Sequence, residues 1–114
     1  MTRSNTSIDL MIQEIVREVV EAVAPERIIL FGSSACGRLG PDSDVDLLVV
    51  EKESAFHQGS RRAESSRIRR ALWKFPIPID VLIFTPEEID HWKDSKNHII
   101  GRSTREGRVV YDRS

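Results

Sequence analysis

Two aspartates one residue apart, Asp44 and Asp46, stand at the start of an apolar run that spans residues 45–50. The run is rich in β-branched and large apolar residues and is too short for a helix, so it predicts a buried strand. Successive strand side chains alternate between the faces of a sheet, and both carboxylates should therefore point the same way. Carboxylates held that close repel each other unless a cation lies between them. The pair therefore predicts a site for a divalent cation such as Mg2+, which binds through one or two carboxylates together with substrate phosphates.

A third aspartate, Asp80, is the only charged residue in the apolar run of residues 77–84. Burial of a lone ionised carboxylate is costly unless the group is paired or bound to a metal. Asp80 therefore needs a partner, and the site formed by Asp44 and Asp46 is the obvious one. Glu51 is the competing third ligand, but strand alternation turns it away from Asp44 and Asp46.

The dipeptide Gly32-Ser33 follows another short apolar run, residues 28–31, which also predicts a buried strand. Glycine directly after a strand allows a sharp turn and a close approach of the backbone to a ligand. Ser33 adds a hydroxyl donor, and residues 34–36 could open a short helix whose free N–H groups attract phosphate. Together with the aspartates, this dipeptide predicts a nucleoside triphosphate and metal site between two strands.

A purely structural alternative is that Asp42 and Asp44 only shape a turn before the second strand. The sequence Pro-Asp-Ser is typical of turns and accounts well for Asp42. It does not account for Asp46, which lies inside the apolar run, or for Asp80, which lies in a separate one.

Three other ligand-binding motifs are excluded because residues that they require are missing from this chain. Residues 32–37 have the glycine spacing of a P-loop, but Arg38-Leu39 stands where Lys-Ser/Thr is required. Residues 42–53 are spaced like an EF-hand loop, but Leu47 occupies the position that requires glycine. The Gly-x-Gly-x-x-Gly sequence of dinucleotide-binding folds is absent.

Two helices are predicted to flank these strands. Residues 7–24 carry apolar side chains at intervals of three and four, which predicts an amphipathic helix that covers the sheet. Residues 61–74 predict a second helix, and Trp73 and Phe75 near its end are expected to pack in the core or at its edge. This helix carries a basic run that is either a solvated face or a docking surface for an acidic partner or a nucleotide, formed by Arg61, Arg62, Arg67, Arg69 and Arg70.

The rest of the chain predicts short elements. Pro78 places the strand of residues 77–84 at a sheet edge or at a strand start, because proline cannot donate to a ladder. Residues 85–88 are a helix start, with Thr85 as N-cap, Pro86 at the first position and Glu88 completing a capping box. We expect a helix to about residue 92, a helical turn or two within residues 97–104 and a brief strand at residues 109–111.

The length and composition limit the kinds of protein to which this chain can belong. A length of 114 residues fits one domain, residues 1–114, of which residues 1–6 are expected to be disordered. A net charge of −1 gives no sign of direct nucleic-acid or membrane binding. Cys36 is the only cysteine and is expected to be a small buried side chain rather than a reactive thiol. The three histidines have no metal-ligand spacing, so each is expected to be a surface or local hydrogen-bonding residue. No run approaches membrane-spanning length, and we expect a cytoplasmic protein.

Gly32-Ser33, ten further residues, Asp44-Val45-Asp46 and a later Asp80 resemble the signature of the DNA-polymerase-beta-like nucleotidyltransferase superfamily. The short length, the preceding helix and the ending of residues 105–111 are similar to the minimal nucleotidyltransferases (MNT). These are commonly the antitoxin half of bacterial HEPN/MNT toxin–antitoxin pairs.

The resemblance implies an α+β fold, with a mixed sheet of about four strands flanked by helices. It implies Mg2+-dependent transfer of AMP from ATP to a hydroxyl, which in the antitoxins is a tyrosine of the partner HEPN toxin, an RNase. Asp44 and Asp46 would hold two metal ions, and Asp80 would complete the metal site and help to deprotonate the hydroxyl. Gly32 and Ser33 would hold the β- and γ-phosphates. Members often carry a basic residue where this chain has Cys36, and Arg38 would supply that charge.

Two alternatives differ in class from a protein adenylyltransferase. The first is an antitoxin that keeps the fold but neutralises its toxin by binding alone. The second is a small-molecule nucleotidyltransferase of the aminoglycoside-modifying type, which is less favoured because the chain leaves little room for an acceptor-binding domain.

Overall fold

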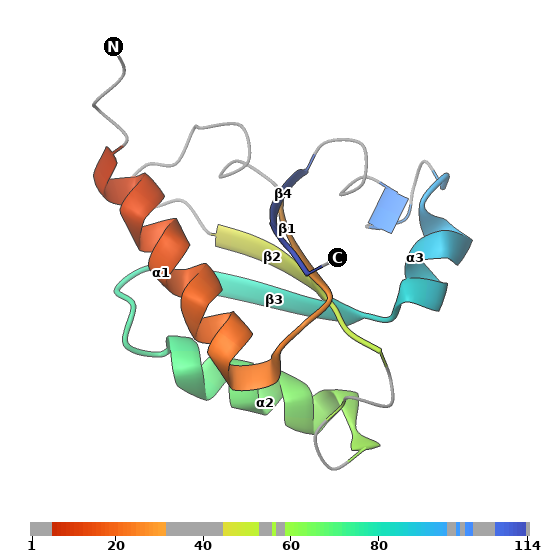
Figure 1. The fold of residues 1–114 in the computed structure, drawn as a ribbon, viewed down its shortest axis with the longest axis horizontal. Coiled ribbons are helices and arrows are strands. Elements are labelled where there is room, and N and C mark those ends of the chain that lie inside the picture. Colours follow the sequence, from red (N-terminus) through yellow and green to blue (C-terminus); the bar gives the residue numbers. More distant parts are fainter. Residues whose placement is uncertain are drawn as a thin grey trace.

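Three helices and four strands make up the part of the chain that the computed structural model describes, which is residues 6–31, 45–52, 56, 59–95, 98, 100–101 and 107–113. In chain order these elements are α1 (Thr6–Val23), β1 (Arg27–Phe31), β2 (Val45–Val50), α2 (Arg61–Leu72), β3 (Ile79–Phe84), α3 (Pro86–Trp92) and β4 (Arg108–Asp112) (Figure 1).

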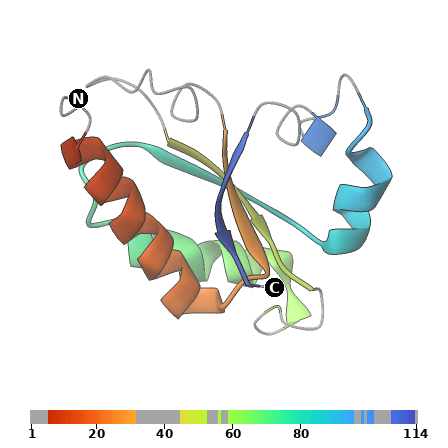
Figure 2. The same cartoon turned by 45° about the horizontal axis from the view of Figure 1, so that its top comes forward.

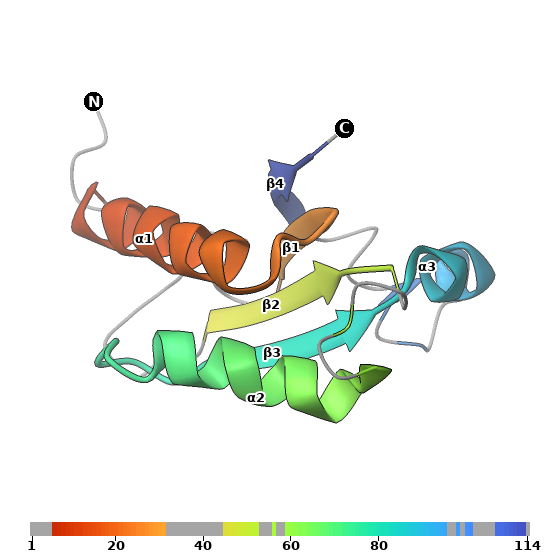
Figure 3. The ribbon, with the colours of Figure 1, turned by 60° about the horizontal axis from the view of Figure 1, so that its bottom comes forward.

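The four strands form one sheet in the order β3-β2-β1-β4. β1 pairs antiparallel with both β2 and β4, whereas β2 and β3 are parallel, and their arrowheads point the same way in Figure 3. A parallel pair needs a long crossover connection, and α2 lies within it. The mixed sheet of about four strands flanked by helices, which the family resemblance implied, is confirmed.

The helices cover both faces of the sheet. Figure 2 shows α1 and α2 on one side of the strands and α3 on the other. On the first side, the apolar stripe of α1 packs against strand side chains such as Ile28 and Leu47, through the buried residues Ile12, Ile15, Val19 and Val23. On the second side, a smaller cluster joins Leu48 to Ile89 of α3. Because each fully buried side chain of this size contributes about 1.5–3 kcal/mol, these contacts hold the strands in register. In the described part of the chain, no helix has the length and apolar character needed to cross a membrane.

The observed bounds of the elements differ from the predicted ones at a few positions. β3 begins at Ile79 rather than at residue 77, because Pro78 cannot donate to the ladder and its carbonyl instead accepts from the N–H of Val45 at 3.0 Å. The prediction that Pro78 marks an edge strand or a strand start is confirmed on both counts. The sequence predicts that Thr6 belongs to a disordered segment, but Thr6 is the first residue of α1. The predicted helical turn at residues 97–104 lies mainly outside the described residues.

Two aromatic side chains are found where the sequence did not predict them. Trp73 was expected at the core or its edge and is 83% exposed. The inward stripe of α2 continues from Ile68 and Leu72 to Phe75, which packs against the core, and this leaves Trp73 turned outward. Phe56, from the segment between β2 and α2, is buried in the core without any periodic signal in the sequence.

The start of α3 is as predicted. The hydroxyl of Thr85 accepts from the N–H of Glu88 at 3.2 Å, and the Glu88 carboxylate accepts from the N–H of Thr85 at 2.8 Å. Pro86 occupies the first helical turn. The reciprocal bonds satisfy two backbone donors that a helix start otherwise leaves without partners.

We expect Thr85→Ala to lower the free energy of unfolding by about 1 kcal/mol, since it removes the side-chain half of this capping box. Urea unfolding followed by circular dichroism measures the change. Thr85→Ser keeps the hydroxyl and should lose clearly less, so equal losses in the two variants would contradict a capping role.

Candidate active site

Asp46 of β2 and Asp80 of β3 are direct partners in the parallel ladder. Paired residues in neighbouring strands project from the same face, and their strands lie about 4.8 Å apart. Asp80 is exposed, so the burial that the sequence predicted for it is wrong, and Asp46 is partly buried. The structure therefore brings together two of the three aspartates that the sequence singled out, although they are separated by the whole of α2.

This pair lies on the face of the sheet that α1 and α2 leave open. The neighbours of Asp80 in β3, Ile79 and Val81, turn toward the core with α2, and alternation sends Asp80 and Leu82 to the opposite face. Leu82 is 37% exposed, so the surface beside Asp80 is accessible. On this face α3 packs through Ile89 in a cluster with Leu48 and Val50, which lie beyond Asp46 in β2.

The end of β1 reaches the same place. Phe31, its last residue, is the antiparallel partner of Asp46, and Gly32-Ser33 follows Phe31 directly in the sequence. The positions that were predicted to bind phosphate or to complete the metal site lie outside the described residues: Gly32, Ser33, Arg38 and Asp44. Their roles therefore stay predictions, as does the buried environment expected for Cys36.

The donor chemistry of the pair fits a hard divalent cation. Two carboxylates on facing positions supply oxygen ligands, and they would repel each other without a positive charge between them. Among the described residues no group of three metal-ligating side chains is found. Asp44, which the sequence also predicted as a metal ligand, directly precedes Val45 in the sequence and lies outside the described residues.

Glu51, the competing third ligand, lies at the opposite end of β2 from Asp46 and is almost fully buried beside Glu64 of α2. Burial first, and then the neighbouring Glu64 carboxyl, raise the pKa of Glu51 from 4.5 to about 9. Glu51 is therefore protonated at neutral pH and can donate a hydrogen bond to an acceptor such as a carboxylate. This position and this protonation state exclude Glu51 from the metal site.

The burial of Glu64 has a signal in the sequence, because Glu64, Ile68 and Leu72 recur at intervals of four along one helix face.

The described histidines are local structural residues, as their spacing predicted. His98 accepts a hydrogen bond from the N–H of Ile100 at 3.1 Å and stacks on Trp92 with ring centroids 4.2 Å apart. His91 is exposed and meets Trp92 edge-on. His57 lies outside the described residues.

Comparisons with known proteins give matches to a protein family and to solved structures. The family model of the nucleotidyltransferase domain matches residues 12–105. The fold is similar to the crystal structure of a candidate nucleotidyltransferase from Sulfolobus solfataricus, with a TM-score of 0.62 and 19% sequence identity over 99% of this chain and 91% of that chain. At this identity the likeness concerns the fold alone. No curated protein matches this chain.

The raised pKa of Glu51 predicts the pH dependence of stability. The folded chain holds the proton of Glu51 more tightly than the unfolded chain does. The stabilisation of the fold by this proton is therefore complete below pH 4.5 and is lost as the pH rises toward 9. Within this window the free energy of unfolding should fall by up to about 1.4 kcal/mol per pH unit. Urea unfolding at several pH values tests this.

Glu51→Gln keeps a neutral side chain of similar shape and should flatten this fall. Glu87→Gln, an exposed carboxylate in the first turn of α3, is the matched control and should keep the wild-type slope. A Glu51→Gln variant that loses stability with pH as steeply as the wild type would show that another group causes the effect.

Proposed function

This chain belongs to the nucleotidyltransferase domain family, and on that premise we propose that it transfers AMP from ATP to a hydroxyl group of a partner protein in a Mg2+-dependent reaction. The observation that carries the proposal is the register of β2 and β3, which pairs Asp46 with Asp80 on an accessible face of the sheet. Two facing carboxylates beside the chain segment that leads into Gly32-Ser33 are what metal-assisted nucleotidyl transfer needs.

In the proposed reaction, the acceptor oxygen attacks the α-phosphorus of ATP. A new oxygen–phosphorus bond forms, the bond between the α- and β-phosphates breaks, and pyrophosphate leaves. Asp80, the more exposed of the two aspartates, is placed to take the proton of the attacking hydroxyl. Asp46 and Asp80, with Asp44, would hold two Mg2+ ions, which when bound neutralise the charge that develops on the phosphate oxygens. Gly32, Ser33 and Arg38 would position the triphosphate.

We further propose that the acceptor is a tyrosine of a HEPN-type toxin and that its modification silences the toxin. The resemblance to the minimal nucleotidyltransferases motivates this acceptor, and the exposure of the site supports it. β3 is an edge strand and Asp80 is exposed, so a large acceptor surface can approach. The chain would thus act as an antitoxin through catalysis.

Replacement of either paired carboxylate tests the catalytic role. Asp46→Asn and Asp80→Asn should each lower the transfer of labelled AMP from ATP to a HEPN-type toxin by at least about 100-fold, or ~2.7 kcal/mol in the activation barrier. Glu14→Gln, an exposed carboxylate on α1, should keep the wild-type rate.

The same variants separate catalysis from binding alone. If AMP transfer carries the antitoxin function, Asp46→Asn fails to neutralise the RNase activity of the toxin although it remains folded by circular dichroism. Full neutralisation by Asp46→Asn would overturn the catalytic proposal in favour of an antitoxin that acts by occupying its toxin.

A further inference from the structure

The exposed side of α2 carries arginines that make no ion pair with the described residues. α2 contains five arginines and one acid, Glu64, which is buried. Two of these arginines are used in packing, because Arg61 donates to the carbonyl of Ile83 and pairs with Glu88 at 3.1 Å, and Arg67 donates to the carbonyl of Ala22 at 2.7 Å. The other three, Arg62, Arg69 and Arg70, are exposed and make no ion pair within the described part of the chain.

Helix electrostatics account for only part of this pattern. Arg69 and Arg70 stand in the last turn of α2, where the helix dipole favours positive charge. Arg62 stands in the first turn, where the dipole disfavours it. Arg62, Arg69 and Trp73 also fall at intervals of seven and four, which places them along one stripe of the helix.

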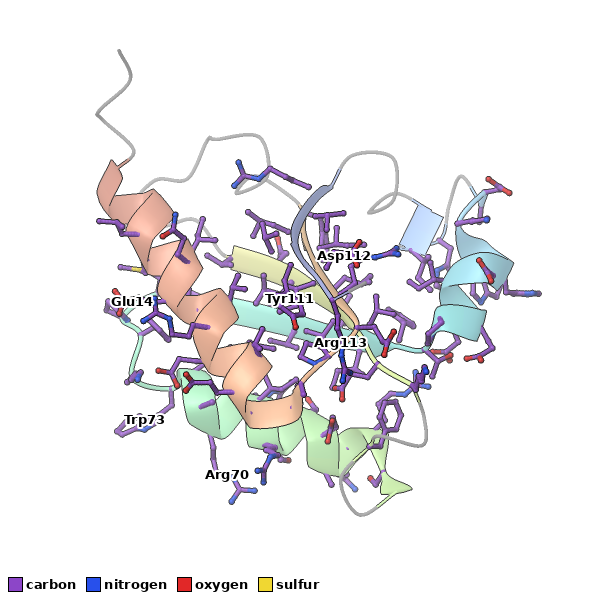
Figure 4. The ribbon with its side chains drawn as sticks, in the orientation of Figure 1. Glu14, Arg70, Trp73, Tyr111, Asp112 and Arg113 are labelled. Atoms are coloured by element: carbon purple, nitrogen blue, oxygen red, sulfur yellow. The ribbon has the colours of Figure 1, made fainter. Side chains whose placement is uncertain are left out.

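Trp73 is the most exposed large apolar side chain among the described residues, at 83%. Figure 4 shows Trp73 and Arg70 projecting away from α2 and from the sheet. An indole that contributes nothing to the core leaves its large apolar surface in water, which is unfavourable unless a partner covers it.

This stripe ends beside the strand that carries Asp80. A hollow of about 170 Å3 lies between the end of α2 and the start of β3, lined by side chains that include Arg69, Trp73, Ile79 and Val81. Ile79 and Val81 are the two neighbours of Asp80 in β3. A macromolecule seated on the end of α2 therefore lies across the edge strand from the candidate catalytic carboxylate.

We propose that Arg62, Arg69, Arg70 and Trp73 form a docking surface for an acidic patch on the protein that supplies the acceptor hydroxyl. This inference rests on the proposed function, because it gives the acceptor a place from which to reach Asp80. Arginine and tryptophan are the residues most enriched at the energetic centres of protein interfaces. Complementary charge also speeds the encounter of the two proteins.

The charge balance favours an acidic protein over a nucleic acid as the occupant. The chain has 17 basic and 18 acidic residues, so its overall field does not attract a polyanion along its length. The three arginines gather on the exposed side of one short helix, which matches a local acidic patch better than an extended phosphate backbone.

The kinetic test compares two double charge reversals. Arg69→Glu/Arg70→Glu should raise the KM for the HEPN-type acceptor at least about tenfold at low salt, with the affinity for ATP and the kcat at saturating acceptor within about twofold of wild type. Arg17→Glu/Lys52→Glu changes the charge equally at exposed positions outside α2 and should leave this KM unchanged. An unchanged KM in Arg69→Glu/Arg70→Glu would overturn the docking surface.

A binding test that needs no catalysis separates this inference from the proposed function. In a Trp92→Phe background, whose folding is checked by circular dichroism, Trp73 is the only tryptophan. Binding of poly-L-glutamate should shift the fluorescence emission of Trp73 to shorter wavelength, and added salt should weaken this binding. Arg69→Glu/Arg70→Glu should lower the affinity for poly-L-glutamate at least about tenfold. No shift, or a shift at lower concentrations of poly(A) RNA than of poly-L-glutamate, would overturn the proposal. Absence of AMP transfer by the wild type would contradict the proposed function. The fluorescence measurement would still show whether the arginines and Trp73 bind an acidic polypeptide.

Discussion

The parallel hydrogen bonding of β2 to β3 determines whether this chain has a reactive centre. A slip of one residue in that ladder would send Asp80 to the face covered by α2 while Asp46 stayed on the open face. The bond from the N–H of Val45 to the carbonyl of Pro78 fixes the register at its first rung. The apolar residues between the helices and the strands fix it further along, because each of them fits only one face. The burial of the core and the pairing of the two aspartates therefore have the same structural cause.

The two faces of the sheet have different tasks. The face under α1 and α2 is filled with aliphatic side chains and supplies most of the stability. The other face carries a smaller cluster that includes Ile89 of α3, and it is accessible at Asp80 and Leu82 of the edge strand. Charge is also distributed unevenly, since three arginines of α2 are exposed and make no ion pair with the described residues although the chain as a whole is almost neutral. Composition alone could not reveal such a surface, because the acidic residues elsewhere cancel it in the sum.

Much of the fold follows from local patterns. The stripe of α1, the bounds of β2 and the cap of α3 each depend on side-chain periodicity or on short-range hydrogen bonds, and these were predicted correctly. Asp46 and Asp80 were linked on the expectation that Asp80 is buried, whereas the structure has Asp80 exposed and brings the two together through the register of β2 and β3. The proximity of Glu51 to Glu64 and the exposure of Trp73 depend on how α2 rotates against the sheet, which sequence spacing only partly specifies. Gly32, Ser33, Arg38 and Asp44 keep their predicted roles as predictions, because they lie outside the described residues.

The pairing of β1 with β4 joins segments from near the two ends of the described chain, with Arg27 opposite Asp112. Contacts between such distant segments form late in folding because they close the longest loops. On the ribosome, β1, β2 and β3 can assemble before residues 108–112 have emerged. During that interval one edge of β1 exposes backbone groups that could pair with a strand of another nascent chain. Pairing of β4 with β1 covers this edge and removes a place at which nascent chains could aggregate.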